Sequence, residues 1–488
     1  MPQRKKLVLV VIDGFGRPLF DRAMAEGRIP TLAGLLAQGT VHPPAVSCFP
    51  SLTPVCLSAI ATGRGPDGSF IPSLVWYHRG ERRFVEYGSS FKATLVEGTL
   101  AFINDAIMNL NHLHLSQRER TLFELVEDAG LVAGAINYFV FRGRVRHPLK
   151  HRRALPVARR MGMFDAAYGP SRFFFGELFA SDVTGAPGNL GVHGRNDVHA
   201  AAVGQWLVAR DGFDFLLYYL PEVDMAQHRV GPDAALDAVE RADASVRVLV
   251  DAAGGLERFL ERYAVIFCAD HGQTLVRETF ELRSALPDLP QFVSSLRSSP
   301  EASAIAVSAS NRAAMVYRLT DAPPSRALAA RLEERPQIDV AAFDEDGWHV
   351  ARRAGEEVRF RLDPAGEPDA RGHRWALAGE PGALGLERAG GLLRSTAYPN
   401  ALERLHQLLA CVNAGEVVAS AAPGVEFADA GGSHHLGGGS HGGLGAEESL
   451  VPLATVGVER VSLPDEPSIT DVYGLVARHF GLDDAQTR

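Results

Sequence analysis

Residues 7–14 read LVLVVIDG, an uninterrupted apolar run that ends at an aspartate and a glycine. Such a run is typical of a β-strand buried on both faces, with a polar residue at its carboxyl end. Two later segments share this design: FDFLLYYL at 213–220 leads to Asp224, and YAVIFCA at 263–269 leads to Asp270. We therefore expect three strands to deliver acidic side chains to one edge of a sheet, where ligand sites of open α/β sheets lie.

Helical patterns separate these strand candidates along the chain. They cover residues 30–39, 120–130 and 234–255. Alternating strands and helices predict an α/β fold in which a mostly parallel central sheet carries helices on both faces, a three-layer sandwich.

The composition of the sequence changes after about residue 280 to segments rich in Pro, Ser and Arg, where short strand candidates surround one helical segment. The strand candidates are residues 313–319, 338–343 and 348–353, and the helix covers residues 325–334. We interpret this part as an α+β cap, residues 291–419, inserted into a discontinuous core. The core would consist of residues 1–290 and 420–488, with a closing strand at 450–458 and a closing helix at 468–481.

The composition of the 488-residue chain is that of a globular protein, with 46% hydrophobic and 22% charged residues. Its net charge of −9 gives no long-range attraction for nucleic acid or an anionic membrane, so an anionic substrate would need local cations such as metal ions. The apolar run after MPQRKK is too short for a signal peptide, and no run approaches the ~18 residues that span a membrane. We expect a soluble cytoplasmic protein, and its four cysteines without paired spacing fit a reducing compartment.

Acids and histidines follow the strand candidates at spacings that suit metal binding. Asp224 and His228 are four residues apart, which places both side chains on one side of a helical turn, although a helix-capping Asp and a surface His would look the same. Asp270 and His271 precede a glycine at a strand end, from which both can approach one ion. With Asp13 and with His441 in the glycine-rich stretch 430–443, the set contains three Asp and three His, ligand types suited to Zn²⁺ or Mn²⁺.

Residues 49–63 read FPSLTPVCLSAIATG, where eight residues separate Thr53 from Thr62-Gly63. With the acids and histidines, this segment resembles the alkaline phosphatase superfamily, and most closely its type I phosphodiesterase/nucleotide pyrophosphatase family. In that family the nucleophile is a Thr or Ser that begins a helix before a Thr-Gly pair, so the resemblance implies Thr53. A helix-capping role for Thr53 is compatible with this, because a helix N-terminus favours negative charge on a phosphate. The resemblance covers residues 7–70, 213–275 and 436–480.

The resemblance also implies a dimetal mechanism and a grouping of the ligands. Two ions about 3.5–4 Å apart would clamp a phosphoryl oxygen, activate Thr53 for in-line attack and stabilise the leaving oxygen, with a phosphothreonine as intermediate. One ion would be held by Asp13, Thr53, Asp270 and His271, and the other by Asp224, His228 and His441.

Two positions depart from the family's motifs and leave alternatives open. The Asn that usually stands three residues after the nucleophile is Cys56 here, and Ser69-Phe70 replaces a His-Gly pair. A phosphodiesterase or nucleotide pyrophosphatase is the favoured interpretation, a phosphomonoesterase is the alternative, and a non-catalytic metal-stabilised binding protein of the same fold is a third reading. A sulfatase is disfavoured because Leu52 stands where the C-x-P-x-R motif requires Arg, and a phosphoglycerate mutase because its G-N-S-E-like loop is absent.

Substrate contacts are the least defined part of the prediction. Cys56, Trp76 and Tyr77 follow the nucleophile closely enough to line a pocket for a small phosphate ester, nucleotides being one class. His434 and His435 are either loop residues or a phosphate contact near His441, and we favour the loop. The sequence leaves the natural substrate, the choice between zinc and manganese, and the oligomeric state open.

Overall fold

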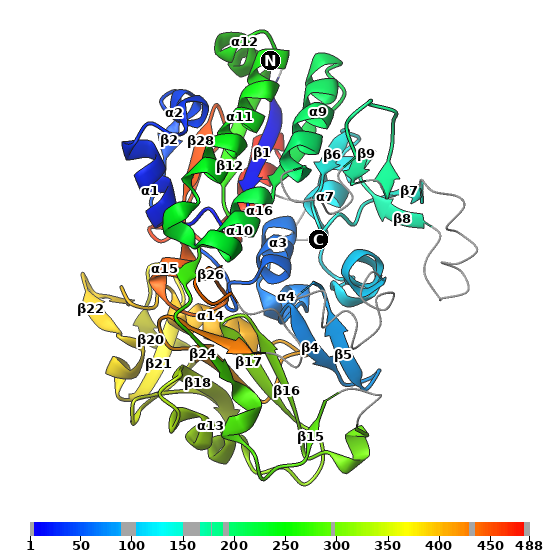
Figure 1. The fold of residues 1–488 in the computed structure, drawn as a ribbon. Helices are drawn as coiled ribbons and strands as arrows, with labels where there is room; N and C mark the ends of the chain where they lie inside the picture. Colours follow the sequence, from blue (N-terminus) through cyan, green and yellow to red (C-terminus); the bar gives the residue numbers. More distant parts are fainter. Residues whose placement is uncertain are drawn as a thin grey trace.

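A computed structural model describes residues 4–88, 104–149, 166–176, 178–188, 195–293, 298–428 and 435–482. Its main sheet has eight strands, and the apolar run near the N-terminus is a central one (Figure 1). In spatial order the strands are β10 (Phe179–Ala180), β9 (Arg172–Phe175), β6 (Ala133–Ile136), β11 (Phe215–Leu220), β1 (Lys6–Ile12), β12 (Tyr263–Cys268), β28 (Leu453–Val456) and β2 (Thr40–Val41).

Strand β1 is parallel to both of its neighbours, β11 and β12. Strands β6 and β9 extend the parallel part, whereas β10, β28 and β2 pair antiparallel at the two edges. Every residue of β11 and β12 is buried, as expected for strands covered on both faces. The predicted α/β fold with a mostly parallel central sheet is confirmed, and its antiparallel edge strands were not foreseen.

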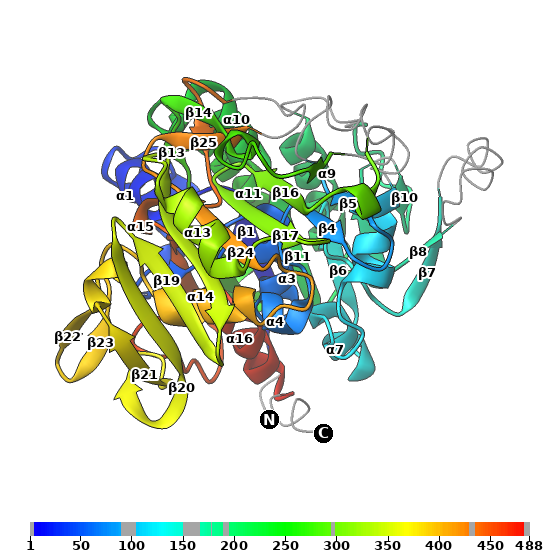
Figure 2. The same ribbon diagram turned by 90° about the horizontal axis from the view of Figure 1, so that it is seen from below.

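Helices cover both faces of this sheet, so that three layers are seen in Figure 2. One layer contains α1 (Arg17–Ala25), α2 (Pro30–Leu36), α9 (Asn196–Ala209) and α11 (Leu236–Ala252), and the opposite layer contains α3 (Thr53–Thr62), α7 (Leu122–Asp128) and α16 (Asp471–Phe480). The helices predicted at 30–39, 120–130 and 234–255 are thus α2, α7 and α11. Helix α7 stops short of the predicted end because Gly130 takes φ 79°, the left-handed conformation that ends a helix.

A second eight-stranded sheet lies beside the first (Figure 1) and contains the predicted short strands. Its order is β15 (Gln291–Phe292), β16 (Ile305–Ser310), β17 (Ala313–Arg318), β24 (Val417–Ala421), β18 (Ile338–Glu345), β19 (Trp348–Arg353), β20 (Glu356–Pro368) and β21 (Arg374–Gly379). The helices associated with it are α13 (Ser325–Glu333) and α14 (Ala401–Leu409). The division into a core and an inserted cap at residues 291–419 stays a prediction.

The side chains of β18 alternate between two hydrophobic clusters, which shows how the second sheet packs against the rest of the molecule. Ala341 and Phe343 pack with Leu328 of α13, in a hydrophobic cluster separate from the main core. Val340 and Ala342 point to the other face and join the main core. Because side chains alternate across a strand, one face of the second sheet is covered by α13 and the other is fixed to the rest of the molecule.

Several shorter elements lie outside the two eight-stranded sheets. They are α10 (Glu222–Val230), α4 (Pro66–Ser69), β4 (Val75–His78), β5 (Arg83–Glu86), β25 (Val425–Ala428), β26 (Gly439–Ser440) and a π-helix (Asn104–His114).

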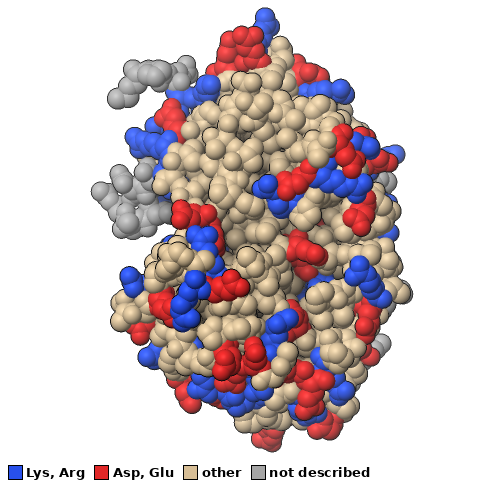
Figure 3. All heavy atoms as spheres, turned by 90° about the vertical axis from the view of Figure 1, so that its left-hand side faces the viewer, with Lys and Arg blue, Asp and Glu red and all other residues tan. Residues whose placement is uncertain are grey.

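Charged side chains of both signs lie on the face of the molecule drawn in Figure 3. On the face drawn in Figure 3, the Lys and Arg side chains are interspersed with Asp and Glu. No helix in the described part of the chain combines the length and the apolar character needed to span a bilayer.

Asp197, in the first turn of α9, gives the protein a pH-dependent stability. Burial, and secondarily the charge of Glu222, raises its pKa to about 8. A raised pKa means that folding favours the protonated acid, so this contribution is complete below the ordinary pKa near 3.8 and is lost as the pH rises through about 8. The loss amounts to at most about 1.4 kcal/mol per pH unit.

We therefore expect Asp197→Asn, which cannot ionise, to gain stability over the wild type progressively between pH 4 and pH 8. Thermal unfolding of both proteins across this range, with the same metal loading, measures the difference. Asp237→Asn is the control because Asp237 lies in the first turn of α11 with a side chain that is 80% exposed. A constant difference between Asp197→Asn and the wild type at all pH values would contradict the assignment.

Candidate metal centre

Three neighbouring strands bring the candidate acids together, as their sequence positions predict. Asp13 directly follows β1, Asp270 lies two residues beyond β12, and Asp224 lies in the first turn of α10, which begins just after β11. Because β11, β1 and β12 are adjacent and parallel, all three carboxylates reach the same edge of the sheet.

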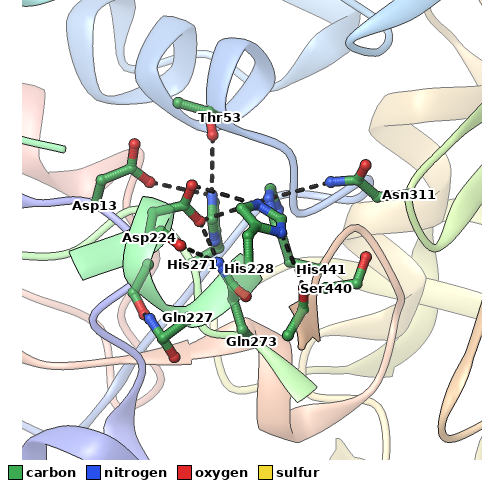
Figure 4. A network of polar contacts seen from close by, with 12 residues as sticks. Asp13, Thr53, Asp224, Gln227, His228, His271, Gln273, Asn311, Ser440 and His441 are labelled. Atoms are coloured by element: carbon green, nitrogen blue, oxygen red, sulfur yellow. Dashed lines mark hydrogen bonds and ion pairs between the residues drawn. The ribbon is translucent and has the colours of Figure 1, made fainter. Parts of the chain in front are cut away.

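Asp13, Asp270 and His271 form the first group, with Thr53 beside it. His271 Nε2 lies 3.4 Å from Asp13 Oδ1 and 3.5 Å from Asp270 Oδ2. The hydroxyl of Thr53 lies 3.1 Å from the same nitrogen (Figure 4). Single potential ligand atoms from Asp13, Asp270 and His271 all lie within 4.8 Å of one another, which is compatible with one shared ion.

The second group consists of Asp224, His228 and His441. Asp224 Oδ2 lies 3.4 Å from His228 Nε2, and Asp224 Oδ1 lies 3.7 Å from His441 Nε2. The two groups are adjacent, because the rings of His271 and His441 stack with centroids 3.7 Å apart (Figure 4). The structure thus brings together all seven residues that the sequence predicted as ligands.

Each histidine is oriented by a backbone carbonyl on the far side of its ring. The Nδ1 atoms of His228, His271 and His441 lie 2.9, 3.2 and 2.7 Å from the carbonyl oxygens of Gly439, Gly272 and Ser51. A carbonyl only accepts, so each Nδ1 carries the proton and each neutral ring has its lone pair on Nε2. Three Nε2 lone pairs therefore face carboxylate oxygens, an arrangement that suits shared cations.

Two carboxylate oxygens of the first group also lack hydrogen-bond partners. Asp13 Oδ1 and Asp270 Oδ2 are buried and accept no hydrogen bond. Burial, together with the charge of Asp270, raises the pKa of Asp13 well above its usual range. Burial alone would lower the pKa of His228, but the neighbouring Asp224 carboxylate raises that pKa above its ordinary value. Buried carboxylates that are negatively charged when ionised, with Nε2 lone pairs between them, suit divalent metal ions.

Thr53 is placed by the start of α3. It is the first helical residue, with Leu52 as the N-cap, so the expected capping role is shifted by one position. The Thr53 side chain makes no capping hydrogen bond and its hydroxyl faces His271 instead. This position sets the hydroxyl beside the candidate metal ligands at a helix N-terminus, where negative charge is favoured.

A cavity of about 520 Å³ opens onto both groups and Thr53. Its lining includes the polar side chains of Asp13, Asp224 and His441. It also includes the largely apolar side chains of Leu74, Tyr87, Leu110, Phe139 and Met225. The cavity thus joins a candidate metal centre to an apolar chamber.

Two further residues line the cavity that the sequence analysis did not assign to the site. His435, which we had favoured as a loop residue, lines the cavity with its ring centroid 4.2 Å from that of His228, and Glu426 Oε1 lies 2.6 Å from His435 Nδ1. Asn311 comes from the turn between β16 and β17. The repeated histidines of the glycine-rich stretch were a signal for His435, whereas nothing in the sequence marked Asn311. His434 lies outside the described residues.

The three predicted substrate contacts are packed away from this wall. Cys56 is fully buried, with its Sγ 3.1 Å from Ser47 Oγ. Trp76 is fully buried against the rings of His78 and His114. Tyr77, 2% exposed, packs against phenylalanine and tyrosine rings of the second sheet and its surroundings. Their side chains serve the core, and we do not propose them as substrate contacts.

Another cluster of possible ligands among the described residues consists of His78, Glu81 and His114. The Glu81 N–H donates to His78 Nδ1 at 2.9 Å, so this lone pair is occupied and Nε2 carries the proton. His78 therefore offers no free lone pair, and we assign no metal to this cluster.

Comparison with known proteins identifies the family of the chain. The sequence model described as type I phosphodiesterase/nucleotide pyrophosphatase matches residues 7–443. The chain belongs to this family. It is accordingly a metal-dependent hydrolase of phosphate esters, in a family of dimetal enzymes. No curated protein sequence matches the chain significantly.

Solved structures of this family's fold resemble the chain over almost its whole length. Phosphonoacetate hydrolase from Sinorhizobium meliloti 1021, in complex with phosphonoformate, gives a TM-score of 0.60 at 16% identity, covering 98% of this chain and 96% of that chain. Murine ectonucleotide pyrophosphatase/phosphodiesterase 5 gives a TM-score of 0.55 at 15% identity, covering 98% and 95%. At such identities the likeness shows the fold alone, and it confirms the predicted alkaline phosphatase-like architecture.

Proposed function

We propose that this protein is a dimetal phosphodiesterase that cleaves P–O bonds through a phosphothreonine on Thr53. The observation that carries the proposal is the position of Thr53, which lines the cavity with its hydroxyl 3.1 Å from His271 Nε2. Asp13, Thr53, Asp270 and His271 would hold one ion, and Asp224, His228 and His441 the other. The ions would supply charge for the phosphoryl oxygens and lower the pKa of a bound hydroxyl or water.

The protein's own groups then perform the substitution. The Thr53 oxygen attacks phosphorus while its proton passes to solvent. The bond from phosphorus to the leaving oxygen breaks, and the alkoxide takes a proton from solvent and departs as the alcohol. The N-terminus of α3 stabilises the negative charge carried by the phosphorylated Thr53. Water then attacks the same phosphorus, releases the phosphate product and restores the hydroxyl.

The apolar chamber favours a diester over a monoester. A monoester carries one organic group and a more highly charged phosphate, whereas a diester has a second organic substituent that needs a surface of its own. Leu110, Phe139 and Met225 offer that surface, and burial of an apolar group against it contributes roughly 25 cal/mol per Å². Substrates would be small phosphate esters with an aromatic or aliphatic substituent, which includes nucleotides.

Three histidine nitrogens among the ligands favour zinc over magnesium or calcium, with manganese as the alternative. Elemental analysis of the purified protein tests this choice, and two equivalents of zinc per chain are expected. The predicted cytoplasmic location is part of the same proposal.

We expect bis-p-nitrophenyl phosphate to be hydrolysed with a kcat/KM at least about 10-fold above that of p-nitrophenyl phosphate, since the second aryl group removes water from the apolar wall. Steady-state kinetics on the zinc-loaded protein measures the ratio. A ratio below one would identify a phosphomonoesterase instead. No hydrolysis of either ester, with zinc or manganese bound, would leave the non-catalytic binding protein as the remaining interpretation.

A further inference from the structure

Asn311 reaches the metal centre from the second sheet. It occupies the turn between β16 and β17 with φ 51°, a left-handed conformation that asparagine tolerates better than most residues. Its carbonyl accepts a hydrogen bond from Phe427 N at 2.7 Å, and the next residue, Arg312, donates from its backbone N–H to the carbonyl of His441 at 3.0 Å. The turn is thereby fixed to the chain segment that carries His441.

The side-chain amide of Asn311 faces a nitrogen that belongs to the second ligand group. Its Nδ2 lies 3.2 Å from His441 Nε2 (Figure 4). Because His441 Nδ1 is protonated toward Ser51, this Nε2 carries a lone pair and the amide donates to it. A metal ion on Nε2 would occupy that lone pair, so the amide N–H groups of the metal-loaded protein need another acceptor in the cavity.

Asn311 adds a neutral hydrogen-bond donor to the lining of the cavity. The position from which the family usually supplies an amide is Cys56, whose thiol is buried against Ser47 and does not reach the cavity. Among the described residues that line the cavity, Asn311 carries the single side-chain amide. An uncharged donor can lie beside two divalent cations without the repulsion that a Lys or Arg would meet.

We propose that Asn311 donates a hydrogen bond from Nδ2 to a non-bridging phosphoryl oxygen of the substrate, a proposal that rests on the proposed function. The second sheet would then contribute a catalytic residue. A donor aimed at an oxygen that gains negative charge in the transition state is worth about 10²–10³-fold in rate. The acceptor shares its chemistry with inorganic phosphate, which can therefore serve as a probe of the ground state.

The test compares Asn311→Gly and Asn311→Asp with the wild type. Glycine keeps the φ 51° backbone and removes the amide, and aspartate keeps the shape but replaces the donor with a negative charge. Asn400→Gly is the matched control, because Asn400 has φ 56° and precedes α14 without lining the cavity. For the wild type and each variant we would measure three quantities. They are the zinc content, the calorimetric affinity of the zinc-loaded protein for inorganic phosphate, and kcat/KM for bis-p-nitrophenyl phosphate.

Both Asn311 variants are expected to retain two zinc ions, to bind phosphate about 10-fold more weakly and to lose about 10²–10³-fold in kcat/KM, while Asn400→Gly matches the wild type. Phosphate affinity and kcat/KM within about 3-fold of the wild type, with full zinc, would overturn the role of Asn311 and leave the proposed function intact. Loss of zinc from Asn311→Gly would overturn it as well, because the residue would then help to hold metal. A wild type that binds phosphate equally with and without zinc would overturn the proposed function itself.

Discussion

Thr53→Ala is expected to lower kcat for bis-p-nitrophenyl phosphate by about 10³-fold or more, because the variant has no oxygen to attack phosphorus. The Thr53 hydroxyl points at His271 and makes no capping hydrogen bond. Its removal therefore takes no hydrogen bond away from within α3. Zinc content should stay above one equivalent, since six of the seven candidate ligands remain. Steady-state kinetics and elemental analysis of the same preparation measure both quantities.

Two matched variants separate nucleophile loss from a general disturbance of α3. Thr53→Ser retains the hydroxyl and should keep activity within about 10-fold of the wild type. Ser58→Ala removes a hydroxyl from the same helix, one that donates to Pro54 O, and should leave kcat unchanged. Acid quenching during turnover should trap phosphate on the peptide containing Thr53 in the wild type. Equal rates for Thr53→Ala and the wild type would exclude Thr53 as nucleophile.

Removal of the metal ions is expected to lower activity by about 10³-fold or more and to lower the melting temperature as well. Ligands that bind only the folded protein stabilise it by about 4 kcal/mol at 1,000 times Kd. In the metal-free protein, burial and the charge of Asp270 raise the pKa of Asp13, so this part of its stability is complete at low pH and is lost as the pH rises through the raised pKa. Metal binding needs the ionised carboxylates, so the difference in melting temperature should grow with pH.

Dialysis against a chelator, followed by addition of Zn²⁺ or Mn²⁺, measures this effect at pH 5 and pH 8. Asp270→Asn should resemble the chelated protein even with zinc in excess. The control is Asp243→Asn, because Asp243 is also buried but accepts hydrogen bonds from the backbone of Thr31 and Leu32, away from the centre. This variant should be less stable but keep its zinc. Full activity after complete removal of metal would exclude a dimetal mechanism.

The sequence could predict those parts of the molecule that depend on local pattern. The apolar runs before Asp13 and Asp270 identify strands buried on both faces, and parallel strands bring their carboxyl ends together. Asp224 and His228 both lie in α10, as their four-residue spacing predicts. Thr53 was found through a motif and lies one position further into α3 than a capping residue.

The rest depended on tertiary packing. Asn311 reaches the cavity only because the turn after β16 is fixed beside His441, and no pattern in the sequence relates these two segments. The carbonyls that orient the histidines are backbone atoms, which any residue could supply. Trp76 shows the opposite error: closeness to Thr53 in the sequence suggested a pocket wall, but the residue lies in β4 with its ring in the core.

The central place of β1 has a consequence for how the protein is made. Its partners begin far along the chain, since Leu7 pairs with Phe215 and Lys6 with Tyr263. At synthesis rates of about 5–20 residues per second, a ribosome needs roughly 10–40 s after β1 to produce β11. During this interval one of the most apolar segments of the nascent chain has no partner, and aggregation competes with folding. The first strand of this enzyme therefore stays without its sheet neighbours until about the middle of the chain has been synthesised.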